Sequence, residues 1–122
     1  MPIKVTAETF EAEVLQSKTP VLVDFWAPRC LPCRMLAPLL EELAEELGDQ
    51  IKICKADADE ELTLALQYGV MALPTLMLFR DGKAADTTVG LPTKEELLEF
   101  LALGEIPAAE VKPAPASVAE FD

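Results

Sequence analysis

The chain has 122 residues, of which 51% are hydrophobic, and its formal net charge of −12 reflects 22 acidic against 10 basic residues. This length suits one domain with its own core, and the negative charge argues against partners with exposed phosphates, such as nucleic acid or anionic membranes. No N-terminal signal-like segment and no run of about 18 apolar residues occurs, so we expect no membrane contact and a cytoplasmic protein.

The first part of the chain alternates predicted strands and helices. Residues 3–5 are typical of a short strand, and residues 6–17 show helical spacing, with Thr6 or Thr9 as the candidate cap. Residues 21–26 form a near-continuous apolar run, which is typical of a strand covered on both faces of a sheet.

Two cysteines, Cys30 and Cys33, follow this strand directly. The next segment predicts an amphipathic helix that is kinked by Pro38 and ends at Gly48. Its apolar face consists of Leu36, Leu39, Leu40, Leu43 and Leu47. A strand that leads a Cys-x-x-Cys pair into a helix places one sulfur at the positive end of the helix dipole, where a thiolate is stabilised.

The middle of the chain repeats the alternation. Residues 51–56 predict a strand, and residues 59–68 predict a helix with Leu62, Ala65 and Leu66 facing inward. Cys54, within that strand, is expected to be a small buried hydrophobe, with a regulatory thiol as the alternative.

The last predicted elements are a hairpin and a helix. Residues 75–79 and 84–89 predict two strands joined by the turn Arg-Asp-Gly-Lys, and residues 94–103 predict a helix that begins with a Thr-x-x-Glu capping box. The element order predicts an α/β fold whose central mixed sheet has about five strands flanked by four helices. We expect this domain to span 1–104. Residues 105–122, rich in Pro, Ala and acidic side chains, read as a flexible tail or a docking segment.

Several segments of this chain resemble the thioredoxin family. They are Val-Asp-Phe-Trp-Ala at 23–27, Cys-Leu-Pro-Cys-Arg-Met-Leu-Ala-Pro at 30–38, and the stretch 68–79 with its Leu-Pro-Thr. The resemblance covers about residues 3–103 and implies the thioredoxin fold and dithiol–disulfide exchange. The chain departs from the family pattern at Pro28, Arg29 and Leu31, where acidic, Trp and Gly residues are usual. These changes bear on redox poise and substrate choice.

The cysteine pair and its neighbours carry the expected chemistry. Cys30 is the candidate nucleophile, and we hypothesise that the helix dipole and the Arg29 charge lower its pKa below the ~8.5 of a free thiol. Cys33 is the candidate resolving thiol. Pro32 removes a backbone donor between the sulfurs. Leu31 is either a substrate contact or a tolerated exposed residue. The alternatives for the pair are two inert cysteines or half of a metal site.

Two charged residues complete the predicted catalytic set. Asp24 is unexpected in so apolar a strand, and burial would raise its pKa. By resemblance it would lie behind Cys33 and exchange the resolving proton through water, with Lys55 near it as its pairing partner. The alternative is that Asp24 points to solvent at a sheet edge.

The resemblance also implies a substrate surface. Pro74 resembles the family's cis-proline, which would leave the Leu73 backbone free to pair with an extended substrate. Trp26 and Gly90 should border the same surface, although Trp26 could be core and Gly90 could mark a bulge.

The resemblance therefore implies a protein-disulfide reductase that needs no cofactor and no metal beyond the redox-active Cys30–Cys33 disulfide. It would act as a monomer on oxidised proteins and be re-reduced by a thioredoxin reductase. Because the chain has no His, a Cys-His zinc site is excluded. Two alternatives stay open: a more oxidising isomerase or oxidase, and a non-catalytic binding module on the same fold.

Overall fold

The computed structural model describes residues 2–102 and shows a five-stranded sheet with helices on both faces. The strands are β1 (Ile3–Lys4), β2 (Val21–Trp26), β3 (Lys52–Asp57), β4 (Thr75–Arg80) and β5 (Lys83–Val89). The helices are η1 (Glu11–Leu15), α1 (Leu31–Leu47), α2 (Leu62–Gln67) and α3 (Lys94–Ala102), with a 3₁₀ turn η2 (Gly48–Gln50). The predicted α/β fold is confirmed; the predicted tail, 105–122, lies outside the described residues.

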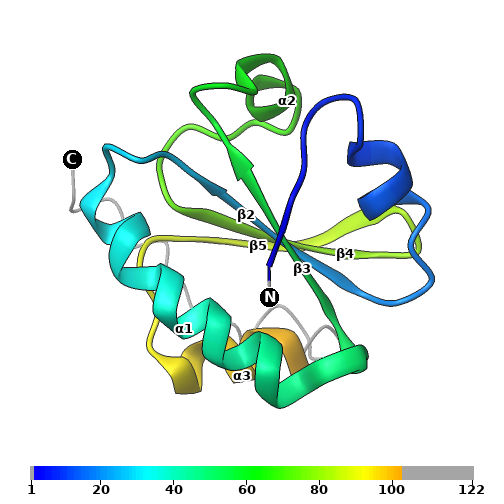
Figure 1. The fold of residues 1–122 in the computed structure, drawn as a ribbon, viewed down its shortest axis with the longest axis vertical. Helices are drawn as coiled ribbons and strands as arrows, with labels where there is room; N and C mark the ends of the chain where they lie inside the picture. The colour runs from blue at the N-terminus through cyan, green and yellow to red at the C-terminus, as the bar shows by residue number, and fades with distance from the viewer. Residues whose placement is uncertain (1, 103–122) are drawn as a thin grey trace.

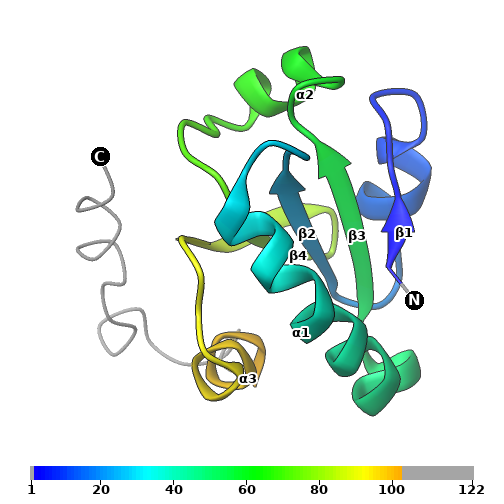
Figure 2. The same cartoon turned by 60° about the vertical axis from the view of Figure 1, so that its left-hand side comes forward.

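The sheet is mixed, as the element order predicts. Its strand order is β1-β3-β2-β4-β5, in which β2 pairs parallel with β3 and antiparallel with β4. The carboxyl ends of β2 and β3 therefore meet at one edge of the sheet, beside the start of α1 (Figure 2). No helix within residues 2–102 has the length and apolarity needed to cross a membrane.

Alternation along β2 divides the core into two layers, because successive side chains of a strand point to opposite faces. Val21, Val23 and Phe25 join the layer beneath η1 and α2, whereas Leu22 joins the layer beneath α1 and α3. Figure 1 shows α1 and α3 together on one side of the sheet. Since helices cover both faces, β2 is buried from Val21 to Phe25, and only its last residue, Trp26, is partly exposed.

The first of these layers contains an aromatic cluster. The ring centroid of Phe10 lies 5.3 Å from that of Tyr68 and 5.6 Å from that of Phe79, and Tyr68 and Phe79 are 5.5 Å apart. Two of these contacts are edge-on, the arrangement that aromatic quadrupoles favour. This cluster joins the N-terminal segment to the rest of the fold.

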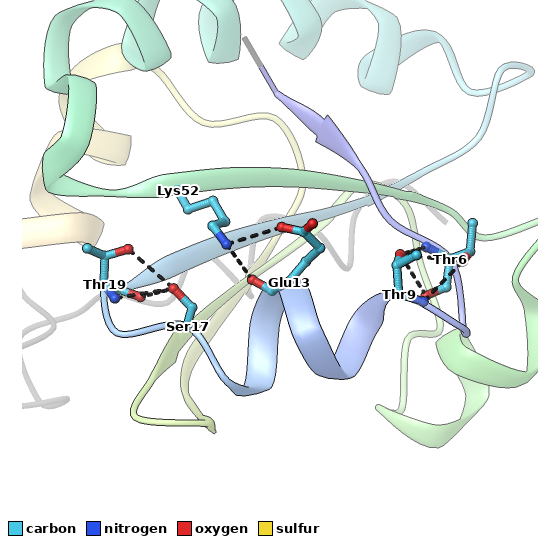
Figure 3. Close-up of polar contacts among 6 residues, drawn as sticks. All are labelled: Thr6, Thr9, Glu13, Ser17, Thr19 and Lys52. Atoms are coloured by element: carbon cyan, nitrogen blue, oxygen red, sulfur yellow. Dashed lines mark hydrogen bonds and ion pairs between the residues drawn. The ribbon is translucent and has the colours of Figure 1, made fainter.

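The N-terminal helix is shorter than predicted. Thr6 and Thr9 close the turn that precedes it, since Thr6 Oγ1 accepts the Thr9 N–H at 3.3 Å and Thr9 Oγ1 accepts the Thr6 N–H at 2.9 Å, but the N-cap of η1 is Phe10, which makes no side-chain cap hydrogen bond (Figure 3). The regular part, η1, is one π-helical segment of five residues. Lys52 Nζ donates to the Glu13 carbonyl at 2.9 Å and to its carboxylate at 3.2 Å, which ties η1 to β3.

The predicted inward face of α2 is wrong at two of three positions. Leu62 and Leu66 are 59% and 65% exposed, whereas Leu64 and Ala65 are buried against the aromatic layer. The helix has only six residues, fewer than two turns, so periodicity alone cannot choose its buried face.

The predicted hairpin turn and the predicted capping box of α3 are confirmed. Asp81 and Gly82 have φ values of 52° and 79°, as a two-residue hairpin turn requires. A Cβ at Gly82 would lie 2.8 Å from the Leu15 carbonyl oxygen, so the turn also packs closely on η1. In the capping box of α3, Thr93 and Glu96 exchange backbone-to-side-chain hydrogen bonds of 2.9 and 3.0 Å.

Candidate active site

The strand register brings the predicted site residues to one edge of the sheet. Trp26 is the last residue of β2, and Thr75, the first of β4, pairs with Phe25 beside it. Pro74 lies directly before Thr75, and the Leu73–Pro74 peptide bond is cis, as the resemblance implies; the Pro74 carbonyl accepts the Gly90 N–H at 2.9 Å. The loop from β2 to α1 starts at the same edge and carries Cys30, and Cys33 follows in the first turn of α1.

Cys30 and Cys33 are joined by a disulfide, with their Cα atoms 5.3 Å apart. Cys30 is the N-cap of α1, and its Sγ accepts the Cys33 N–H at 3.2 Å. Cys33 is 1% exposed, whereas Cys30 is partly exposed and its neighbour Leu31 is 61% exposed. Cys30 is therefore accessible to solvent and to a docking protein, whereas Cys33 is not.

The start of α1 favours negative charge on Cys30. The first N–H groups of a helix have no intrahelical partner, and the helix dipole places partial positive charge there. The Cys33 N–H already points at Cys30 Sγ, and Pro32 adds no donor of its own. A thiolate at Cys30 would accept the same hydrogen bond with greater strength.

Asp24 is fully buried, and neither carboxylate oxygen has a hydrogen-bond partner among the described residues. Leu22 lies two positions earlier on β2 and contacts the α1 layer, so Asp24 points into that layer as well. Burial raises the pKa of Asp24 to about 7, opposed in part by the Lys55 charge. The alternative of a solvent-facing Asp24 is therefore wrong.

Lys55 lies near Asp24, as predicted, but forms no ion pair with it among the described residues. It is opposite Asp24 in the β2–β3 register, but its Nζ lies 4.3 Å from the centroid of the Trp26 ring. No ion pair joins it to Asp24 within the described part of the chain, and the Asp24 oxygens stay without partners. The expected pairing is wrong; Lys55 acts on Asp24 through its charge only, while it stacks on a half-buried Trp26.

Arg29 is not the free charge that the sequence suggests. Its Nε and Nη2 donate to the two carboxylate oxygens of Asp59, each at 3.0 Å. Sequence reasoning missed Asp59, which is 30 residues away along the chain. The sequence pattern Asp57-Ala58-Asp59 could have indicated a turn here, because an Asp side chain often accepts the N–H two residues on. In the structure, Asp57 Oδ1 accepts the Asp59 N–H at 2.9 Å.

The predicted substrate-binding residues differ in accessibility. Pro74 and Gly90 are buried, so they can offer backbone but little side-chain surface. Leu73 is half-buried and packs against the aromatic layer. Leu31 is therefore the most accessible apolar side chain among the residues predicted to contact substrate.

Cys54 lies apart from this edge in the middle of β3 and is fully buried. Burial raises the pKa of its thiol to about 11, which agrees with its expected role as a small hydrophobe. Within residues 2–102, no group of three or more His, Cys, Asp or Glu side chains is arranged to hold a metal ion.

Comparison with known proteins assigns this arrangement to a family. The family model described as Thioredoxin matches residues 1–103. The chain is 52% identical over 97 residues to thioredoxin 1 of Synechococcus elongatus, which covers 80% of this chain and 91% of that protein. It is 50% identical over 99 residues to thioredoxin of Bacillus subtilis (81% and 93%) and 46% identical over 101 residues to thioredoxin of Rickettsia bellii (83% and 96%).

Proposed function

The chain belongs to the thioredoxin family and is a thiol–disulfide oxidoreductase that reduces protein disulfides, and on this premise we propose that Cys30 attacks and Cys33 resolves. The observation that carries this assignment is the contrast in accessibility between the two joined cysteines. Cys30 is the accessible N-cap of α1, whereas Cys33 lies one turn inside the helix and is buried.

The proposed reaction moves two electrons from the dithiol to the substrate. The Cys30 thiolate attacks one sulfur of a protein disulfide, forms a mixed disulfide and releases the other substrate sulfur as a thiolate. The Cys33 thiolate then attacks Cys30 Sγ, which forms the Cys30–Cys33 disulfide and releases the second substrate thiolate. Both substrate thiolates take up protons, so the substrate is reduced and the protein is oxidised.

Asp24 is proposed as the group that accepts the Cys33 proton through water during resolution. Its burial in the α1 layer and its pKa of about 7 support this role, because such a carboxyl can hold or release a proton near neutral pH. Lys55 is proposed as a second catalytic residue, which stabilises the ionised form of Asp24 from its place over Trp26.

The exposed rim of the site is proposed to hold the substrate. Leu31, Pro32 and Arg29 surround Cys30 in sequence, and Trp26, Leu73, Pro74 and Gly90 lie at the same sheet edge. The backbone at Leu73 would pair with an extended substrate segment. Thioredoxins use no cofactor beyond their redox-active disulfide, and for this chain we propose re-reduction by a thioredoxin reductase, action as a monomer, and a cytoplasmic location.

Insulin reduction coupled to a thioredoxin reductase tests the assignment of the two thiols. Cys30→Ser should abolish turnover, since the attacking thiolate is lost. Cys33→Ser should also abolish turnover but should accumulate a mixed disulfide between Cys30 and the substrate, which gel electrophoresis without reductant detects. Cys54→Ser is the matched control and should retain activity. Accumulation of the mixed disulfide on Cys33 in the Cys30→Ser variant would reverse the proposed roles.

A further inference from the structure

The loop that carries the reactive cysteine is tied to a second loop by an ion pair. Arg29, the residue before Cys30, binds Asp59 through two parallel hydrogen bonds of 3.0 Å. Asp59 follows β3, and the two parallel strands β2 and β3 end side by side at Trp26 and Asp57. The pair therefore joins the two loops that leave neighbouring strands at the active-site edge.

The loop that carries Asp59 is held in place by hydrogen bonds to its backbone N–H groups. Asp57, which is 7% exposed, accepts the N–H groups of Asp59 and Glu60 at 2.9 and 3.3 Å. The Ala58 N–H donates to the Trp26 carbonyl at 2.7 Å and extends the strand pairing by one residue. Asp59 therefore presents its carboxylate from a fixed turn, and the two-point contact orients the guanidinium plane.

The charges of Arg29 and Asp59 have opposite effects on the stability of a thiolate at Cys30. A lone guanidinium next to a thiolate would favour the thiolate, and a lone carboxylate would disfavour it. In the bidentate pair the charges are 3.0 Å apart, so their effects on a sulfur several ångströms away largely cancel. We propose that the Arg29–Asp59 ion pair fixes the position of the loop before Cys30 and has almost no net electrostatic effect on the Cys30 thiolate. The amino end of α1 then determines how readily Cys30 ionises.

This inference rests on the proposed role of Cys30, and it makes Arg29 and Asp59 positioning residues. The two side chains are 70% and 46% exposed, so breaking the pair should not unfold the protein. Apart from Glu60, which serves as the control below, the other charged or titratable groups near this edge are left unchanged in the test: Asp24 on β2, Cys33 and Arg34 on α1, Lys55 and Asp57 on β3, and Glu61 before α2.

The test is the pKa of Cys30 in the fully reduced protein, measured from the pH dependence of iodoacetamide alkylation with the modified cysteine identified by peptide mass spectrometry. Arg29→Met leaves an unpaired carboxylate and should raise the Cys30 pKa by about half a unit. Asp59→Asn leaves an unpaired guanidinium and should lower it by about half a unit, the small size expected for a single charge that acts across a solvated surface. The double variant should return to the parent value within about 0.2 units.

The opposite signs separate charge balance from a purely mechanical contact. A mechanical role predicts shifts in the same direction for both single variants, because each breaks the same pair, and that result would overturn the proposal. Unchanged pKa values in both variants would overturn it as well. Glu60→Gln is the matched control, since it removes a charge from the same turn but from a side chain that pairs with Lys4 at 3.6 Å, and its shift should be the smallest. If the parent Cys30 shows no titratable reactivity, the proposed role of Cys30 fails and this inference fails with it.

Discussion

Replacement of Asp24 by Asn should stabilise the oxidised protein, and the gain should grow with pH. A buried carboxyl without hydrogen-bond partners is tolerated when it is protonated, but its ionised form is strongly disfavoured. The folded state therefore holds the Asp24 proton more tightly than the unfolded chain does. Stability is highest below the unfolded pKa and is lost as the pH rises towards the folded pKa of about 7.

The size of the effect follows from the two pKa values. Folding raises the pKa of Asp24 from 3.8 to about 7, roughly 3 units, and each unit corresponds to about 1.4 kcal/mol. The linkage relation then gives an advantage of Asp24→Asn of less than about 1 kcal/mol at pH 4, about 2 kcal/mol at pH 5.5 and about 4 kcal/mol at pH 8. At acid pH the two side chains are both neutral and nearly isosteric, so little difference is expected.

Urea unfolding of the disulfide-bonded proteins at these three pH values measures the free energy of unfolding directly. Thr75→Val is the matched control. Thr75 is buried at the same end of the sheet and donates to the Ala72 carbonyl at 2.6 Å, but it cannot ionise. Its effect should therefore be a constant loss at every pH. An Asp24→Asn advantage that is absent, or that is equal at pH 4 and pH 8, would refute the electrostatic argument.

Three further outcomes are expected. Asp24→Asn should slow release of the mixed disulfide at pH 7, measured by stopped-flow, because Cys33 loses its proton acceptor; an unchanged rate would remove Asp24 from the mechanism. Phe79→Ala should cost about 3–5 kcal/mol in urea unfolding, since it leaves a cavity in the aromatic layer. Gly82→Ala should cost about 1–2 kcal/mol or more, because φ is 79° and the new Cβ would meet the Leu15 carbonyl at 2.8 Å; thermal unfolding without a lowered midpoint would contradict this packing argument.

Local signals in the sequence were sufficient for the elements that carry the site. The Cys-x-x-Cys pair after an apolar strand predicts an N-cap cysteine, and Cys30 holds that position. The Asp-Gly turn and the Thr-x-x-Glu box likewise depend on residues within four positions of each other, and both form as predicted. Such features depend only on residues that are close together in the sequence, so they can be predicted without knowledge of the rest of the fold.

Contacts between distant segments could not be predicted in the same way. Leu62 and Leu66 have the i, i+4 spacing of a helical stripe, yet packing on the aromatic layer buries Leu64 and Ala65 instead. Lys55 could reach either Asp24 or the Trp26 ring, and the choice depends on side-chain geometry in three dimensions. The partner of Arg29 lies on another loop, which enters the site only because β2 and β3 run parallel.

The central sheet separates the two core layers, and this has a consequence for protein engineering. The aromatic cluster occupies one layer, while Asp24 and the buried side of α1 occupy the other. Substitutions in the aromatic layer lie on the opposite face of the sheet from Asp24, so their free-energy effects should add to those made at the redox centre. Stabilising substitutions could therefore be selected in the aromatic layer while the residues around Asp24 and the buried side of α1 stay unchanged.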